Sequence, residues 1–284
     1  MNRDPYSTPN HVALIPLEPP IVRYVLWGLA VVIIGVIALP APYIFAWAFR
    51  GTGVVGIFSA SSSWSWFSEM LASPEWRSSI VYSALLASGV SLVGATALLL
   101  YFYSIRYVHP VIERFTYAII ITPIILPVAV YALSLRILGS ALSIPEALLV
   151  ATGHLVLVIP LQFFICEAAQ ESVPDTMIHA GTTLGASHLT NLRTIYFPPL
   201  RGAFGLAFLA GWFFSFDELV IAAFVIDTPL VTVPKRLWDA VNRSNDPYPA
   251  VLAVLLILTF ACAVCLGLFG LFLNRRINSN SGRV

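Results

Sequence analysis

Two adjacent acidic residues, Asp217 and Glu218, interrupt an otherwise apolar run of 25 residues from Gly202 to Ile226. A carboxylate in a membrane is costly, on the order of 2.5 to 3.5 kcal/mol for an aspartate at the centre of a span and less toward the interface. Such groups face protein or water. Adjacent helical residues point about 100° apart. We therefore expect one acid to face a helix partner and the other to line a path for a small solute, preferably a cationic or amino-bearing one.

The other reactive side chains do not form a catalytic or metal site. His154 is the only histidine deep in an apolar run and has no H-E-x-x-H or G-x-S-x-G companion, so we expect a packed histidine bonded to a neighbouring helix. Cys262 and Cys265 form a C-x-x-C without a second cysteine pair or a nearby histidine, which favours no metal and no redox centre. No G-x-x-x-x-G-K-[ST] loop occurs. We expect no catalytic residue, no ATPase site and no bound cofactor on this chain.

The composition is that of an integral membrane protein. Of 284 residues, 58% are hydrophobic and only 10% are charged, and the mean hydropathy is +0.86. A soluble domain carries about 25% charged residues, so an ordinary soluble enzyme is excluded. The 15 basic and 14 acidic residues give a formal charge of +1, which offers no basic face for nucleic acid. The expected surroundings of the chain are membrane lipid.

Apolar runs predict an all-α fold with six transmembrane helices. A hydrocarbon core of about 30 Å needs roughly 20 helical residues at 1.5 Å each. Five uncharged runs reach that length, and the run broken by the two acids is the sixth. On this run, which is the fifth span in chain order, small residues recur every four positions at Ala203, Ala207, Gly211 and Ser215, which predicts a face for close helix packing. The predicted spans cover about residues 24–49, 78–105, 115–135, 147–166, 202–226 and 247–274, between tails at 1–23 and 275–284.

The distribution of basic residues predicts that both termini are cytoplasmic. With that orientation, nine arginines lie inside and six basic residues lie outside, in line with the positive-inside rule. Arg275 and Arg276 directly follow the last run. The external loop at 50–77 is rich in aromatic residues and is typical of an interfacial anchor. A second external loop predicts a short helix beginning near Pro234.

The largest internal loop, residues 167–201, reads as two short helices around a glycine. Pro174 suits a first helical position, and Gly185 suits the left-handed residue that ends the first helix. Ser187 is a candidate cap for the second helix, and we expect Pro198 and Pro199 to end it. Such a unit forms a rigid projection at the membrane face, suited to a socket on another protein.

This loop resembles the motif of bacterial ABC-importer permeases, which reads E-A-A, three residues, glycine, nine residues, then I-x-L-P. His179, Ala180 and Gly181 occupy the E-A-A positions before Gly185, and Ile195 to Pro198 occupy the final four. Histidine replaces the glutamate of the motif, glycine its second alanine, and phenylalanine its leucine. The literal Glu-Ala-Ala at 167–169 stands 18 positions before the glycine, against six in the motif, and we place it at the end of the fourth span.

Downstream segments resemble the branch that serves polyamines, opines and related solutes. These segments are Phe214 to Val220, Val233 to Trp238, and the pair Asp246 and Pro247. Together with the internal loop, the resemblance covers about residues 80–274. It implies a single permease domain in the bacterial inner membrane that transports a polyamine, opine or amino-acid-like compound. It also implies a second permease chain, two ATPase subunits that hold ATP and Mg²⁺, and a periplasmic binding protein.

An ion-gradient-driven secondary transporter is the alternative. Proteins of that kind often show paired internal repeats with broken helices, and no second copy of any segment is evident here. An intramembrane enzyme would need a nucleophile and base, or a metal cluster, within the spans. The importer permease accounts for the glycine-centred loop, for which a secondary transporter has no role.

Overall fold

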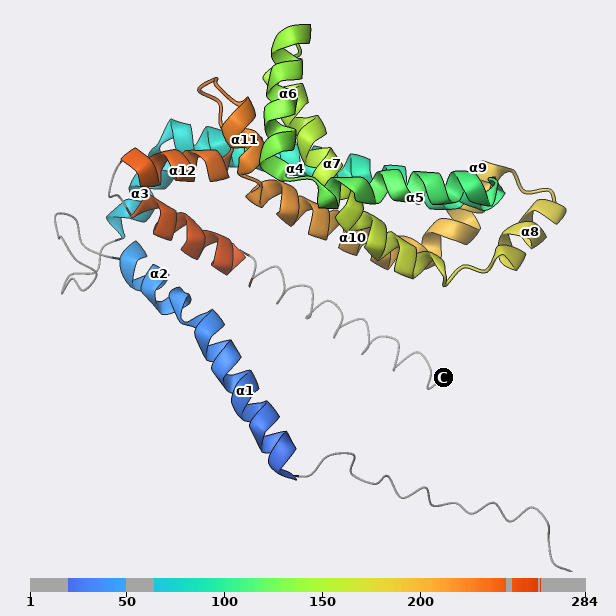
Figure 1. Ribbon diagram of the computed structural model, residues 1–284, viewed down its shortest axis with the longest axis horizontal. Coiled ribbons are helices and arrows are strands. Elements are labelled where there is room, and N and C mark those ends of the chain that lie inside the picture. The colour runs from blue at the N-terminus through green and yellow to red at the C-terminus, as the bar shows by residue number, and fades with distance from the viewer. Residues whose placement is uncertain (1–19, 50–63, 244–246, 260, 262–284) are drawn as a thin grey trace, which may run out of the picture. The chain divides into compact units, whose positions relative to one another are not determined.

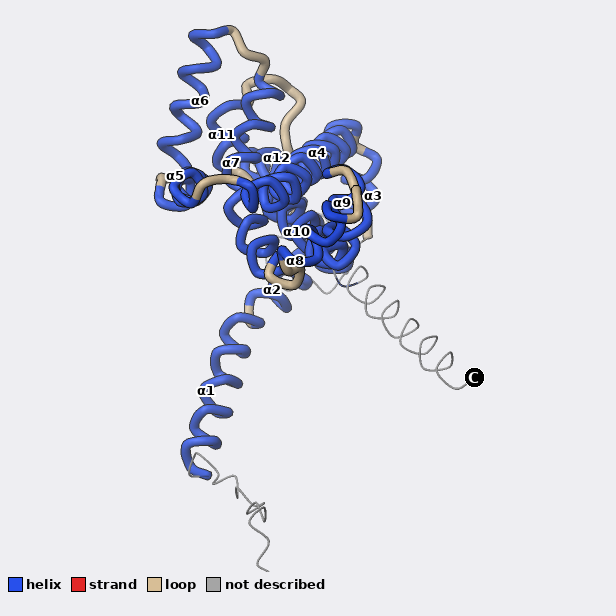
Figure 2. Tube along the Cα trace, turned by 90° about the vertical axis from the view of Figure 1, so that its right-hand side faces the viewer, coloured by secondary structure: helices blue, strands red, loops and turns tan. Residues whose placement is uncertain are grey.

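The chain folds into helices, as a computed structural model describes for residues 20–49, 64–243, 247–259 and 261. Figure 2 shows helices and loops, and no strand, across these residues. The helices are α1 (Pro20–Ala38), α2 (Pro40–Ala48), α3 (Ser65–Ala72), α4 (Pro74–Ser104), α5 (Pro110–Ile125), α6 (Val128–Leu142), α7 (Glu146–Gln170), α8 (Asp175–Thr183), α9 (His188–Asn191), α10 (Phe197–Asp217), α11 (Val220–Val225) and α12 (Val233–Arg243), with a 3₁₀ turn η1 (Ile105–Tyr107) and a π-helical turn η2 (Leu192–Tyr196).

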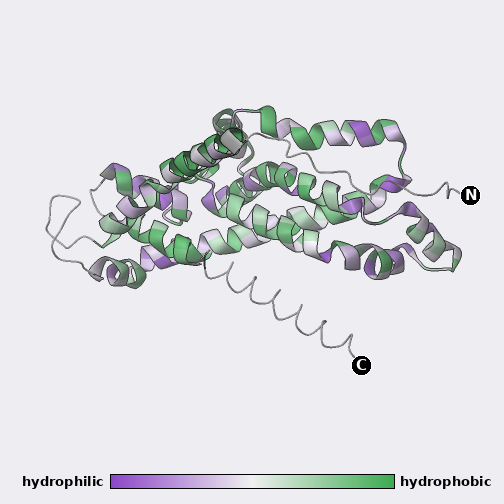
Figure 3. Ribbon diagram, turned by 90° about the horizontal axis from the view of Figure 1, so that it is seen from below, coloured by the Kyte–Doolittle hydropathy of each residue, from purple (hydrophilic) through white to green (hydrophobic). Residues whose placement is uncertain are grey.

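The chain divides into two compact units. Residues 67–249 form one unit, which contains the loop and the acidic pair singled out above. Residues 1–66 and 250–284 belong to the other, whose described helices are α1, α2 and the segment after residue 250. Within the first unit, α4, α7 and α10 lie side by side (Figure 1). Figure 3 shows hydrophobic residues along most of these long helices.

A buried glutamine joins these three helices. Gln162 on α7 is fully buried, and its Nε2 donates to the carbonyl of Ser91 at 3.0 Å, to Ser91 Oγ at 2.9 Å and to the carbonyl of Ala207 at 3.1 Å. Glycines leave the space for it: a Cβ at Gly211 would lie 2.3 Å from Nε2, and one at Gly94 would lie 2.3 Å from Oε1. Ala207, Gly211 and Ser215 are all buried, which confirms the predicted small-residue face of α10.

The described spans agree with the prediction in part. Four segments are long and apolar enough to cross a membrane, and a fifth is available if one bent helix pair is a single span. The six-helix count is therefore not reached within the described residues. Of the predicted span 247–274, the structure describes an apolar helix, Tyr248–Thr259, and nearly all of the remainder lies outside the described residues. The tail residues 1–19 and 275–284 lie outside them as well. The four segments are Tyr24–Ala48, Pro74–Tyr107, Glu146–Gln170 and His188–Asp217.

The predicted span 115–135 is not one straight helix. It is divided between α5 and α6, whose axes differ by 101°, so that α6 stands across α5 in Figure 1. The break falls at Leu126 and Pro127. Proline has no N–H for the helix ladder and disfavours helical geometry in the residue before it, and counting charges does not detect either effect.

The helix predicted near Pro234 is confirmed as α12, and it is tied to α4. The backbone N–H of Val233 donates to Ser83 Oγ at 2.8 Å, and Arg236 Nε donates to Ser79 Oγ at 2.6 Å. In the preceding loop, Asp227 forms an ion pair with Arg136 of α6. These contacts fix the segment 227–243 against α4 and α6.

Candidate functional site

The internal loop has the helix–glycine–helix form expected from its sequence. Helix α8 ends at Thr183, and Gly185 has φ +86°, the only positive φ among the described glycines. Ser187 Oγ accepts a hydrogen bond from the backbone N–H of Thr190 and so caps α9. Pro174 is the residue just before α8 rather than its first helical residue. The predicted roles of Gly185 and Ser187 are confirmed.

The motif residues divide between a buried and an exposed side of α8. His179 and Ala180 are exposed, whereas Gly181 is buried. A Cβ at Gly181 would lie 2.3 Å from Asn191 Oδ1 and 2.6 Å from Ile195 Cδ1. Asn191 is fully buried and donates to the carbonyl of Ile178 at 3.2 Å. Glycine in this position of the motif is thus explained by the close approach of α8 to α9 and η2.

Pro198 and Pro199 do not end the second helix; the prediction that they do is wrong. They are the second and third residues of α10, which follows η2 directly. In the π turn, the N–H of Phe197 donates to the carbonyl of Leu192, five residues back. The missing proline N–H groups fall in the first turn of α10, where they are tolerated. The loop therefore runs without interruption into the fifth span.

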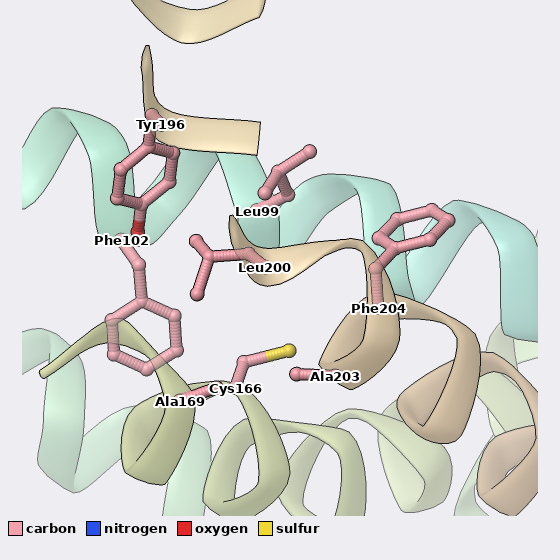
Figure 4. A pocket seen from close by; sticks show the side chains of 8 residues that line it. All are labelled: Leu99, Phe102, Cys166, Ala169, Tyr196, Leu200, Ala203 and Phe204. Atoms are coloured by element: carbon pink, nitrogen blue, oxygen red, sulfur yellow. The ribbon is translucent and has the colours of Figure 1, made fainter. Parts of the chain in front are cut away.

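An apolar core attaches the loop to the spans. Figure 4 shows side chains of α4, α7 and α10 facing one another beneath Tyr196. The cavity between them measures about 10 Å³, roughly one water-sized probe, so it is not a solute site. Val173 and Ile178, which flank the start of α8, belong to the same core. Its buried members are Leu98, Phe102, Tyr103, Phe163, Val173, Ile178, Tyr196 and Leu200.

Large apolar side chains remain on the outer surface of the loop. Leu184 is 88% exposed, and Met177 and Leu189 are about half exposed. Leu184 and Leu189 lie on either side of Gly185 in the sequence, and His179 on α8 is exposed as well. A rigid projection with exposed apolar residues is suited to a groove in a partner protein. We refer to Met177, His179, Leu184 and Leu189 as the loop surface.

The acidic pair lies at a break in the fifth span. Helix α10 ends at Asp217, and Glu218 is followed by the six-residue helix α11. Glu218 Oε1 accepts from the N–H of Val220 at 2.8 Å, and its Oε2 accepts from the N–H of Ile221 at 3.0 Å. These are N–H groups at the start of α11 that have no partner within the helix. The predicted span 202–226 is therefore two helices, and Glu218 caps the second one.

The two acids have different surroundings. The side chain of Glu218 is 7% exposed, and its Oε2 lies 3.4 Å from Nε2 of His154 on α7. His154 Nδ1 forms a 2.9 Å hydrogen bond with Ser215 Oγ, which confirms the prediction of a packed histidine bonded to a neighbouring helix. Asp217 is exposed. Glu218 thus faces a helix partner, while Asp217 is the more accessible acid.

Two open hollows share Glu218 and Phe214 in their walls. One, of about 520 Å³, lies at the bend between α5 and α6 and has an apolar wall that includes Pro123, Phe164 and Phe214, with Glu218 at its edge. The other, of about 550 Å³, is lined by Asp217, Glu218 and Phe214 among others. Each is large enough for a small organic molecule. Sequence reasoning found the acids but missed Phe164 and Pro123, because only the fold brings α5 and α7 together here.

Comparisons with known proteins agree in sequence and in fold. The chain is 24% identical over 208 residues to the spermidine/putrescine transport system permease protein PotC of Haemophilus influenzae, covering 71% of this chain and 79% of the relative. It is 25% identical over 181 residues to PotC of Escherichia coli strain K12, covering 63% and 67%. No family model matches the chain.

Two solved structures share the fold. An amino acid ABC transporter solved with histidines matches with a TM-score of 0.50 and 16% identity, over 72% of this chain and 96% of the other. A bacterial ABC transporter for import of the acidic polysaccharide alginate matches with a TM-score of 0.59 and 16% identity, over 87% and 94%. Together with the PotC relatives, these matches confirm the predicted resemblance to ABC-importer permeases and the all-α membrane fold.

Proposed function

From the premise that this chain is a membrane permease subunit of the ABC-importer class, we propose that it imports a small amine-bearing cation of the polyamine kind. The similarity to two PotC proteins, whose names specify spermidine and putrescine, carries this proposal. The hollow lined by Phe213, Phe214 and both carboxylates is chemically suited to a cation with a methylene body. The comparisons favour this importer over the ion-gradient-driven secondary transporter.

The chain works with other subunits in this proposal. A second, different permease chain completes the path, two ATPase subunits bind ATP and Mg²⁺, and a periplasmic protein delivers the solute. The loop surface docks in a groove of one ATPase, with His179 at the position of the motif glutamate. The rigid core beneath α8 and the continuous passage from η2 into α10 support a role of this loop in carrying the closure of the ATPase to the spans.

The two acids have distinct roles in the path. Asp217 attracts the cation, because it is exposed at the hollow. Glu218 mainly holds α11 in place, because its oxygens are occupied by backbone N–H groups. Neutral Asp217→Asn keeps the size of the side chain and removes its charge, so we expect a higher KM for the cation in a complex that still assembles.

Uptake of labelled putrescine and spermidine tests the function. The assay compares cells that carry the gene with cells that lack it, and with cells that carry Asp217→Asn. We expect uptake to require the gene and ATP, and to fall with Asp217→Asn. Uptake of neither polyamine by cells with the complete system would refute the substrate class. Equal uptake by the wild type and Asp217→Asn would refute the role of that acid.

We propose that the chain lies in the bacterial inner membrane with both termini in the cytoplasm. This orientation puts α8 and the loop surface on the side where an ATPase would be, and it puts α12 on the periplasmic side. The proposal rests on the distribution of arginines and on the docking role of the loop.

A further inference from the structure

One arginine connects the end of α4 to the start of α8. Arg106 lies in η1, directly after α4, and its side chain is 12% exposed. Its Nη1 donates to the carbonyl of Val173 at 3.0 Å and also pairs with Asp175, and its Nη2 donates to the carbonyl of Gln170 at 3.2 Å. The guanidinium thus holds both ends of the turn that leads from α7 into α8.

The acceptors explain why a cation lies here. Gln170 is the last residue of α7, and the carbonyls at a helix C-terminus lack partners within the helix and carry partial negative charge. The guanidinium carbon of Arg106 also lies 5.1 Å from the ring centroid of Tyr196, in η2. A single side chain therefore contacts the last residue of α7, the first residue of α8, and η2.

We propose that Arg106 is the positioning residue through which a movement of α8 is transmitted to α4. The inference rests on the proposed docking of α8 to an ATPase. The apolar core beneath α8 is held by non-directional contacts, whereas the planar guanidinium fork fixes both distance and direction. In the part of the chain that the structure describes, the polar bonds between residues 74–107 and residues 170–183 all come from Arg106.

A second polar contact from α4 goes elsewhere. The hydroxyl of Tyr103 donates to the carbonyl of His188 at 3.1 Å, and so it holds α9, on the far side of Gly185. The helix α8 itself depends on Arg106 for its polar link to α4. Lysine at 106 would keep the positive charge, but an ammonium on a flexible stem does not reproduce a fork that serves two carbonyls and a carboxylate.

The test is ATP hydrolysis by the complex purified through a tag on this chain. Hydrolysis is measured with and without the solute-loaded binding protein, with putrescine as the solute, for the wild type, Arg106→Lys and Arg106→Ala. The matched control is Arg114→Lys, at an exposed arginine of α5. We expect Arg106→Lys to assemble and to keep its basal rate, while stimulation by the binding protein falls at least about fivefold, the lower end of typical coupling between sites. Arg114→Lys should behave as the wild type.

Each other outcome has a defined meaning. Wild-type stimulation in Arg106→Lys would overturn the inference. Loss of assembly in Arg106→Lys at a normal membrane level would also overturn it, because Arg106 would then be a folding residue. If only Arg106→Ala fails to assemble, the stimulation of ATP hydrolysis measured for Arg106→Lys decides whether the inference holds. Failure of the wild-type chain to co-purify with any ATPase would instead refute the proposed function.

Discussion

The substitution Gly211→Ala tests the packing around Gln162. The new Cβ would lie 2.3 Å from Gln162 Nε2, 2.7 Å from Ser91 Oγ and 2.8 Å from Val158 Cγ1. All three neighbours are buried, and Gln162 is held by three hydrogen bonds, so none can move without a cost. Overpacking of this kind costs about 1 to 3 kcal/mol.

The net effect combines three terms. Displacement of Gln162 weakens one or two hydrogen bonds of about 1 kcal/mol each, and alanine in place of glycine returns about 1 kcal/mol of helix propensity. We expect the free energy of unfolding to fall by about 1 to 4 kcal/mol, with a middle value of about 2 to 3 kcal/mol. Gly205 is the matched control on the same helix: a Cβ there meets nothing within 4 Å, so Gly205→Ala should leave stability unchanged or slightly higher.

Thermal unfolding of the detergent-purified chain, followed by tryptophan fluorescence, measures the difference. Gly211→Ala should unfold at a temperature lower by about 5 °C or more, and Gly205→Ala should not. Equal midpoints for the wild type and Gly211→Ala would refute the argument that α4, α7 and α10 meet without spare room. An equal loss in both variants would show that any added methyl group on α10 is harmful, whatever its contacts.

Three further predictions concern the loops. Gly185→Val places a β-branched residue at φ +86°, a strain of roughly 1 to 2 kcal/mol or more. We therefore expect Gly185→Val to lose the stimulation of ATP hydrolysis by the binding protein, whereas Gly185→Asn should retain it, because asparagine tolerates this conformation. Equal stimulation in both variants would mean that the loop is only a connector. The Arg136 guanidinium, by its hydrogen bond, holds the pKa of Asp227 below its ordinary value. Asp227→Asn should therefore lower the unfolding midpoint slightly at pH 7, and the difference should disappear as the pH falls below about 4; a difference independent of pH would contradict this. Reporter fusions after Arg193 should be cytoplasmic and those after Arg236 periplasmic, and the reverse would overturn the orientation.

Local chemistry made part of the site predictable. Gly185 and Ser187 were predicted correctly because a left-handed glycine and a serine cap are decided by the residues beside them. The prolines at 198–199 were misjudged because proline suits both the end and the first turn of a helix, and the π turn that decides between them leaves no sequence pattern. Counting charged residues found the apolar run around Pro127, but it did not predict the bend between α5 and α6 within that run.

Long-range contacts were beyond sequence reasoning. Gln162 reads as a single polar residue in an apolar span, and its partner Ser91 is 71 positions away. Arg106 reads as one of the basic residues that mark the inside face, although it binds two backbone carbonyls 64 and 67 positions later as well as the carboxylate of Asp175. Every residue has a backbone carbonyl, so the sequence does not show which carbonyls will accept a hydrogen bond from Arg106.

The close approach of Gly181 to Asn191 constrains which sequence changes this loop can accept. A methyl group at 181 would meet the buried amide oxygen of Asn191, so the alanine usual in the motif is incompatible with asparagine ten residues later. The two positions should covary among homologues: alanine at 181 should accompany a smaller residue at 191, and asparagine at 191 should accompany glycine at 181. The single exchange Gly181→Ala would then be deleterious in this chain although alanine is the common residue, and a second exchange at 191 would restore it. Two sequence changes would have to occur in a fixed order, the smaller residue at 191 first.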